Sequence, residues 1–278
     1  MSVGVFDTGH YATGLRQRLR RGFELGPRYF MLDIPRYLTQ RRKLGLSLFD
    51  WEALWNPMRS FRNTTYVRLS LPPHYDQALG LLEQTGVRFD NPRSRIEALA
   101  GLWWEVHGVA GDVIECGTYR GATSLLLAAL GKLNGVSQKV LMLDTFAGMP
   151  APSQNDSSRQ TGEFAPPERW TEVIAKQIAA LGVEDRAEIH QGLFSETFPK
   201  LTARGLRLSF VHIDANIFQS TFEACEFTMP RLAGGGAVVF DDYNGMCDLG
   251  ARLAIDSYLA GRGRKPKPLA ECSAYLRT

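Results

Sequence analysis

The sequence has few cysteines and no long hydrophobic run. Its cysteines form no C-x-x-C pair, which is typical of reduced thiols in a cytosolic protein; they are Cys116, Cys225, Cys247 and Cys272. No uncharged apolar stretch approaches the roughly 20 residues of a membrane helix. The basic amino-terminal segment also lacks the apolar core of a signal peptide. We therefore expect a cytoplasmic chain without a membrane partner.

A strong excess of one charge is also missing. The formal net charge of +3 and the pI near 8.7 are too mild to indicate a nucleic-acid partner. Two basic stretches, at 16–21 and 41–43, lack the density and aromatic interleaving of a nucleic-acid module, which favours a solvated helix face or a subunit contact. A chain of 278 residues with 44% hydrophobic content can bury a real core. A soluble globular enzyme is the default expectation.

Residues 1–94 and 95–278 differ in their pattern. In the first region, prolines separate short amphipathic pieces without alternating strands and helices. We expect helices and loops there that shape a substrate pocket or make oligomer contacts. From Arg95 onward, short apolar strands alternate with helices of about 10 to 15 residues. This alternation predicts an α/β domain with a doubly wound, mostly parallel, Rossmann-like sheet.

The expected strands are short apolar runs, at 112–116, 139–144, 187–190, 208–214 and 236–241, with one or two more within 268–278. The expected helices are periodic segments at 96–107, 122–132, 170–181, 220–232 and 249–259. Residues 151–169 are rich in Pro, Ser, Gln and Asn, and we expect them to form a mobile loop over the crevice.

The first expected strand ends in the turn Gly117–Gly121, where backbone N–H groups can approach a ligand closely. The turn is G-x-x-x-G and not the G-x-G-x-x-G fingerprint, which disfavours a nicotinamide-dependent oxidoreductase. Asp144 ends the next strand, where a carboxylate can accept hydrogen bonds from two ribose hydroxyls. A plain tight turn and a capping or turn aspartate remain the alternatives.

Three carboxylates follow two later strands: Asp214, and the pair Asp241 and Asp242. Hard oxygen ligands that converge on one edge suit Mg²⁺, which keeps open positions for water or substrate. Solvation of the strand ends, or capping of the following helix, is the alternative interpretation.

Five motifs, in order, give the region from about Arg95 onward a family resemblance. They are Gly111–Ala122, Asp144–Pro150, Gln191–Pro199, Asp214–Thr221 and Gly235–Tyr243. This region resembles the macrocin O-methyltransferase family of class I enzymes that depend on S-adenosylmethionine (SAM) and methylate sugar hydroxyls of natural products. The resemblance implies that the chain is a homo-oligomer with a sugar or another small secondary metabolite as its methyl acceptor.

The resemblance also implies a cofactor site and a metal site. The turn from Glu115 to Gly121 would lie along the methionine part of SAM, Asp144 would hold the ribose, and Gln191–Phe194 would border the adenine. The implied cofactor-binding residues are Glu115, Gly117, Thr118, Tyr119, Gly121, Asp144, Phe146, Gly192 and Phe194. The implied Mg²⁺ ligands are Asp214, Asp241 and Asp242, and the implied catalytic residues are Asp214 and Asn216.

Asn216 departs from the family pattern, which has an acidic residue credited with taking the hydroxyl proton at this position. An amide cannot act as that base at neutral pH. Three explanations remain: the metal alone acidifies the hydroxyl, another residue such as Tyr243 or an N-terminal histidine serves, or methyl transfer is impaired. We favour metal activation. The second hypothesis is a SAM-binding regulator or scaffold with lost or weak activity. His212, near Asp214, is expected to be a satisfied core histidine.

Overall fold

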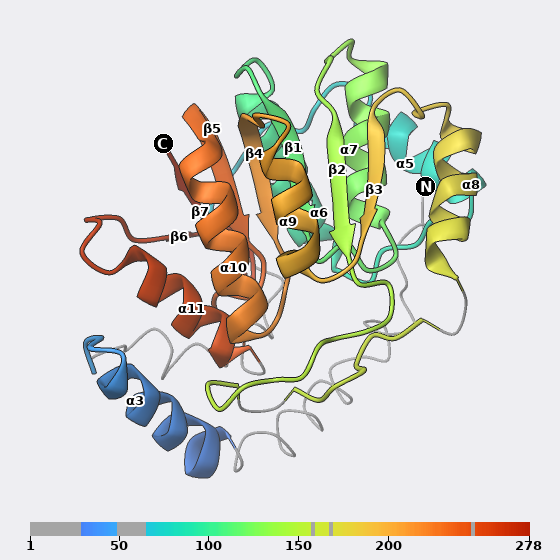
Figure 1. Cartoon of the computed structure of the whole chain (residues 1–278). Coiled ribbons are helices and arrows are strands. Elements are labelled where there is room, and N and C mark those ends of the chain that lie inside the picture. Colours follow the sequence, from blue (N-terminus) through green and yellow to red (C-terminus); the bar gives the residue numbers. More distant parts are fainter. Residues whose placement is uncertain (1–28, 49–64, 157–158, 167–168, 246–247) are drawn as a thin grey trace, which may run out of the picture.

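A computed structural model describes residues 29–48, 65–156, 159–166, 169–245 and 248–278. Its centre is a seven-stranded sheet with the order β3-β2-β1-β4-β5-β7-β6 (Figure 1). The strands are β1 (Asp112–Cys116), β2 (Val140–Asp144), β3 (Ala187–Gln191), β4 (Leu208–Ile213), β5 (Leu232–Phe240), β6 (Lys267–Pro268) and β7 (Ala274–Arg277). The pairs among β1 to β5 are parallel, and β7 is antiparallel to β5 and β6. This topology confirms the predicted doubly wound, mostly parallel fold.

The register of the sheet aligns the ends of four strands. Cys116 pairs with Leu143 on one side and with Ile213 on the other, and Ile213 pairs with Phe240. The residues that follow these four therefore form one row along the carboxyl edge: Asp144, Gly117, Asp214 and Asp241. The strand order reverses between β1 and β4, and such a switch point is where doubly wound sheets bind their ligands.

Helices cover both faces of the sheet, each with an apolar stripe in the core. On one face lie α5 (Tyr75–Gln84), α6 (Arg93–Val106), α7 (Ala122–Leu133) and α8 (Trp170–Leu181). On the other lie α9 (Phe194–Thr202), α10 (Phe218–Thr228) and α11 (Leu249–Leu259). Helix α10 leads through a short 3-10 turn, Met229–Arg231, into β5. Most elements match the predicted ranges within a few residues.

The sequence did not predict helix α9, because Pro199 lies inside it and proline normally breaks a helix. The Glu196 carboxylate accepts a hydrogen bond from the Leu193 backbone N–H at 3.2 Å, which closes the amino end of α9. Phe194, Phe198 and Leu201 are buried against the sheet. Tertiary packing of this apolar face therefore stabilises a helix that local preference disfavours.

The helices that lie within the described part of residues 1–94 are a π-helical turn (Tyr29–Asp33), α3 (Ile34–Lys43) and α5. Helix α5 packs in the same core as α6 and α7. Helix α3 lies against α11, where Arg41 forms an ion pair with Asp256 (Figure 1). The domain boundary near residue 94 stays a prediction. No helix among the described residues is long and apolar enough to cross a membrane.

Candidate functional site

The turn after β1 is held in a conformation that only glycine accommodates at its first position. Gly117 has φ +93°, and a Cβ atom there would lie 1.9 Å from the Asp214 carbonyl oxygen. The turn therefore touches the backbone at the end of β4 directly. Tyr119 also has a left-handed backbone, with φ +50°, which is costly for a bulky residue. Such strain is common where a loop is shaped for a ligand.

Asp144 at the end of β2 organises this turn. Its carboxylate accepts hydrogen bonds from the backbone N–H groups of Tyr119, at 2.7 Å, and Phe146, at 2.8 Å. Phe146 has φ +50°, so the chain turns sharply on both sides of this carboxylate. The Asp144 side chain is only partly buried. Its Oδ1 atom also accepts a hydrogen bond from the Thr145 hydroxyl at 3.3 Å, so Oδ2 keeps a lone pair for a ligand hydroxyl.

The other residues implied for the cofactor occupy different environments. Gly192 has φ +137°, and a Cβ atom there would lie 2.9 Å from the Glu196 carboxylate, so the β3–α9 connection also requires glycine. Phe194 is buried and stacks on Phe198. Thr118 is buried within the turn. Glu115 is 3% exposed, and its carboxylate contacts Ser124 and His212 rather than facing the crevice.

The carboxylates predicted as metal ligands do lie close together. Carboxylate oxygens of Asp214 and Asp241 and a ring nitrogen of His212 all lie within 4.8 Å of one another. Asp242 follows Asp241 directly, and its carboxylate accepts a hydrogen bond from the Asn216 amide at 2.7 Å. The ends of β4 and β5 thus bring Asp214 and Asp241 together, with His212, Asp242 and Asn216 beside them, and the role of the carboxylates as metal ligands stays a prediction.

The electrostatics of the three carboxylates differ. Burial, and then the charge of Asp241, raise the pKa of Asp214 to about 7. Burial, followed by the charges of Asp248 and Asp214, raises the pKa of Asp242 well above its usual range. Burial alone would raise the pKa of Asp241, but the Arg95 guanidinium and the His212 hydrogen bond hold it at about 2. Nearby positive charge therefore outweighs burial at Asp241 but not at Asp214 or Asp242.

His212 is a satisfied core histidine, as predicted. It is 1% exposed, with Nδ1 lying 2.8 Å from the Glu115 carboxylate and Nε2 lying 3.4 Å from the Asp241 carboxylate. Burial disfavours its charged form, but hydrogen bonds to Asp241 and Glu115 raise the pKa of His212 well above its usual value. The imidazolium thus links β1, β4 and β5 below the row of carboxylates.

Two cationic side chains at this edge were not predicted from the sequence. Arg95, at the start of α6, forms an ion pair with Asp241 at 2.5 Å. Arg159, in the loop after β2, forms an ion pair with Asp248 at 2.5 Å. Asp248 precedes α11, and its charge is the largest charge effect on the pKa of Asp242. These partners are far from one another in the chain, so no local motif indicated them.

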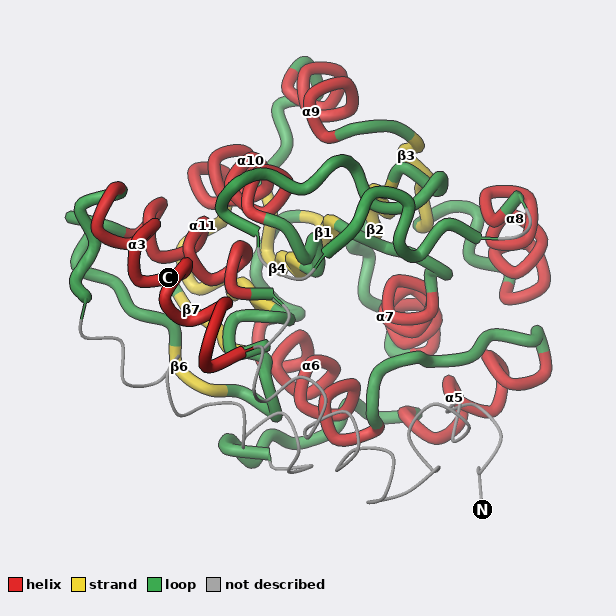
Figure 2. The backbone as a smooth tube through the Cα atoms, turned by 90° about the horizontal axis from the view of Figure 1, so that it is seen from below, coloured by secondary structure: helices red, strands yellow, loops and turns green. Residues whose placement is uncertain are grey.

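The described residues of the loop 151–169 cross the carboxyl edge and are anchored there, and the mobility of the loop stays a prediction (Figure 2). Asp156 is buried and accepts a hydrogen bond from the Phe218 backbone N–H at 2.8 Å, at the start of α10. Phe164 packs edge-on against Tyr119, with ring centroids 5.6 Å apart. The loop thus contacts the β1 turn at one point and the ends of α10 and α11 at others.

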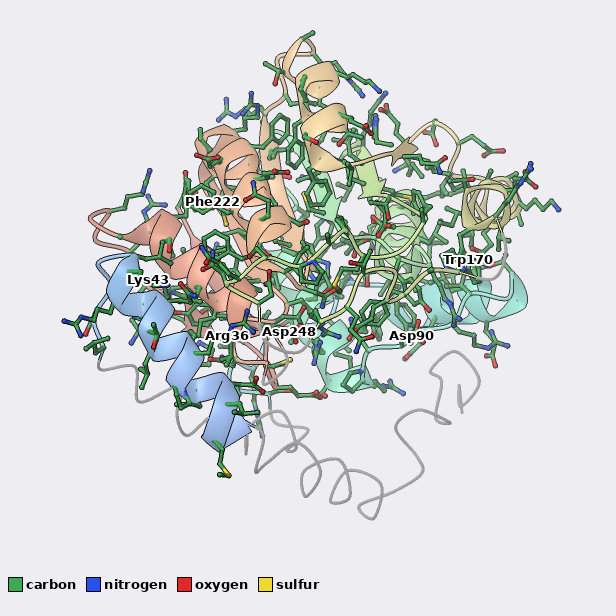
Figure 3. All side chains as sticks on the ribbon, turned by 60° about the horizontal axis from the view of Figure 1, so that its bottom comes forward. Arg36, Lys43, Asp90, Trp170, Phe222 and Asp248 are labelled. Carbon is green, nitrogen blue, oxygen red and sulfur yellow. The ribbon has the colours of Figure 1, made fainter. Side chains whose placement is uncertain are left out.

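Figure 3 shows that the two sides of this edge have different neighbours. Asp248 and Arg36 of α3 lie on one side, and Asp90 and Trp170 lie on the other. Arg120, within the β1 turn, lies 3.6 Å from the Asp90 carboxylate and stacks over the Trp170 ring. Arg36 donates a hydrogen bond to the Gln154 backbone oxygen, so α3 contacts the loop as well as α11.

Solved structures with a similar fold are methyltransferases. The calicheamicin methyltransferase CalS11 is 21% identical, covering 76% of this chain and 94% of its own, with a TM-score of 0.60. The O-methyltransferase NovP is 22% identical, covering 66% of this chain and 78% of its own, with a TM-score of 0.57. At these identities the similarity shows a shared fold.

Curated relatives are enzymes that methylate hydroxyl groups of natural products. One is the 8-demethyl-8-(2,3-dimethoxy-alpha-L-rhamnosyl)-tetracenomycin-C 4'-O-methyltransferase of Streptomyces olivaceus. It is 28% identical to this chain, and the match covers 56% of this chain and 60% of the relative. The mycinamicin III 3''-O-methyltransferase of Micromonospora griseorubida is 27% identical, and the match covers 54% of this chain and 61% of the relative. The match thus spans about three fifths of each relative.

A family profile gives the same assignment as the predicted motifs. The profile described as Macrocin-O-methyltransferase (TylF) matches residues 90–272, which include all five motifs. The match covers most of the described chain, including the row of residues at the carboxyl edge. The chain therefore belongs to the macrocin O-methyltransferase family.

Proposed function

We propose that this chain is a SAM-dependent O-methyltransferase that uses Mg²⁺ to methylate a hydroxyl group of a sugar or another small natural product. The observation that supports it most is the row at the carboxyl edge, where Gly117 packs directly against the backbone of Asp214. A ligand on the β1 turn and a cation on the β4 and β5 carboxylates would therefore be neighbours. Such proximity is what a transfer between two bound groups requires.

The residues fit both groups. The glycines of the turn Gly117–Gly121 let it pack closely against Asp214 and Met142, and Asp144 presents a partly exposed carboxylate for ribose hydroxyls. Asp214 and Asp242 are hard oxygen donors whose pKa values are raised first by burial and then by neighbouring carboxylates. The proposed site residues are therefore those named from the sequence. Glu115 is the exception, because its contacts with Ser124 and His212 give it a supporting role.

When bound, SAM supplies the sulfonium methyl group, and Mg²⁺ lowers the pKa of an attached hydroxyl. The protein's own contribution is to hold these partners and to exclude water. Asn216 donates a hydrogen bond to Asp242, which orients that carboxylate, and its left-handed backbone, with φ +58°, is one that asparagine tolerates well. Asn216 thus acts as a positioning residue, and the loop carrying Arg159 and Phe164 covers the edge.

The direct test is methyl transfer from labelled SAM to glycosylated natural products with a free sugar hydroxyl. We expect turnover that requires Mg²⁺ and that Asp241→Ala abolishes. Full activity in EDTA would exclude the metal role. Light scattering during gel filtration would test the expected homo-oligomer.

Asn216 favours one second candidate, a SAM-binding regulator or scaffold with little or no methyl transfer. The variant Asn216→Asp separates the two hypotheses. If metal activation suffices, turnover changes little, because no extra base is needed. A large gain in turnover would instead identify a degenerate site that has lost its base.

A further inference from the structure

Arg95 connects three parts of the fold around one carboxylate. It lies at the start of α6, and its side chain is 10% exposed. Its Nη1 atom donates to the Asp241 carboxylate at 2.5 Å and to the Asn91 side-chain oxygen at 3.0 Å. Its Nη2 atom donates to the Cys272 sulfur at 2.7 Å and lies 3.7 Å from the Glu271 carboxylate. The guanidinium is therefore fixed on several sides before it reaches Asp241.

Both carboxylate oxygens of Asp241 have a partner. Oδ2 accepts the Arg95 hydrogen bond, and Oδ1 lies 3.4 Å from His212 Nε2. His212 is in turn fixed through Nδ1 by Glu115. The Asp241 carboxylate consequently has one orientation, within the cluster that also contains the Asp214 carboxylate.

We propose that Arg95 is a positioning residue for the cation site, fixing the Asp241 carboxylate in the orientation that faces Asp214. The proposal rests on the proposed function, because it assumes that these carboxylates receive a divalent cation. Carboxylates that bind a metal are commonly oriented by hydrogen bonds from neighbouring side chains. An arginine suits this role, since its planar fork reaches Asp241 and Cys272 at the same time.

A competing effect has the opposite sign. The positive charge of Arg95 repels a bound cation, so removing that charge would strengthen cation binding if repulsion dominated. Two variants separate the effects. Arg95→Lys keeps the charge but loses the fork, whereas Arg95→Gln loses both.

The experiment measures binding of Mn²⁺, as a probe for Mg²⁺, by electron paramagnetic resonance titration of the full chain without SAM or acceptor. Orientation predicts that Arg95→Lys weakens Mn²⁺ binding about tenfold and that Arg95→Gln weakens it by about 10- to 100-fold. The matched control is Arg93→Lys on the same helix, where the arginine is 48% exposed and pairs with Glu97. This control should bind Mn²⁺ like the wild type.

Each outcome is decisive. If Arg95→Lys binds Mn²⁺ as tightly as the wild type, or if Arg95→Gln binds it more tightly, the positioning role is wrong. Should Arg95→Gln fail to fold because Asp241 and Glu271 lose their counter-charge, Arg95→Lys decides alone, with its melting temperature as the check on folding. A wild-type protein that binds no Mn²⁺ would overturn the metal part of the proposed function and this proposal together.

Discussion

The two halves of the carboxyl edge are built in different ways. The β1–β2 half consists of Gly117–Gly121 and Asp144–Phe146, where backbone N–H groups surround one carboxylate. The β4–β5 half consists of Asp214, Asn216, Asp241 and Asp242, where side chains gather around the buried Asp241 and its partner Arg95 from a distant segment. The first half is held by backbone groups of the turns after two adjacent strands, and the second depends on a side-chain ion pair between distant segments. Substitutions in the first half should therefore change the backbone conformation and the stability of the fold. Substitutions in the second half should change the charge of the carboxylate cluster and its affinity for a cation.

The β1–β2 half should respond most to the loss of a glycine. In Gly117→Ala, the Cβ atom would meet the Asp214 carbonyl oxygen at 1.9 Å, at a φ that alanine disfavours. We expect a loss of about 2–4 kcal/mol in the free energy of unfolding, from overpacking and backbone strain. Urea denaturation measures it. Gly135→Ala is the control, since φ is also positive there but nothing lies within 4 Å of the added atom. Equal losses in the two variants would contradict the close approach.

The β4–β5 half should respond most to the loss of a carboxylate. Asp214→Asn keeps the side-chain size but removes the charge of a proposed metal ligand. We therefore expect Mn²⁺ binding to weaken by about 100-fold or more, which is a larger loss than for a residue such as Arg95 that only orients a ligand. The apo protein should stay folded, because the amide replaces a carboxyl whose pKa is already raised. Titration calorimetry measures the affinity. Asp185→Asn, at a carboxylate that is 70% exposed, is the control. Unchanged affinity in Asp214→Asn would refute the metal assignment.

The pH dependence of cation binding should reflect the β4–β5 half alone. The pKa of Asp214 is raised to about 7, so below that pH a cation must displace its proton. Mn²⁺ affinity should therefore fall by at least about tenfold for each pH unit below 7, because the pKa of Asp242 is raised as well. Asp241, with its pKa held at about 2, contributes nothing to this range. Dissociation constants for Mn²⁺ measured at pH 6, 7 and 8 test this pH dependence, and a dissociation constant that does not change with pH would contradict it.

The loop that joins the two halves should give the smallest effect. Arg159→Gln removes the partner of Asp248, whose side chain is 7% exposed, so we expect a loss of about 1 kcal/mol in stability. Arg169→Gln, at an arginine that is 85% exposed, should change stability by less than about 0.5 kcal/mol. Thermal unfolding compares the two variants. If Arg169→Gln costs as much as Arg159→Gln, the loop anchor has no special role.

The same difference explains what the sequence predicted. Strand ends, glycine turns and the row of carboxylates follow from local patterns, and the structure confirms them together with the family. Arg95 is 146 residues from Asp241, and nothing in the sequence between them marks their contact. Helix α9 was missed because local proline preference opposes it, while burial of Phe194 and Phe198 stabilises it.

The most direct test of the two-part edge is calorimetric titration of S-adenosylhomocysteine into the wild type, Asp144→Ala and Asp214→Asn. The account predicts micromolar binding to the wild type and to Asp214→Asn. For Asp144→Ala it predicts binding at least about tenfold weaker, because the carboxylate that organises the turn and accepts the ribose hydroxyls is lost. Wild-type affinity in Asp144→Ala, or lost affinity in Asp214→Asn, would contradict it.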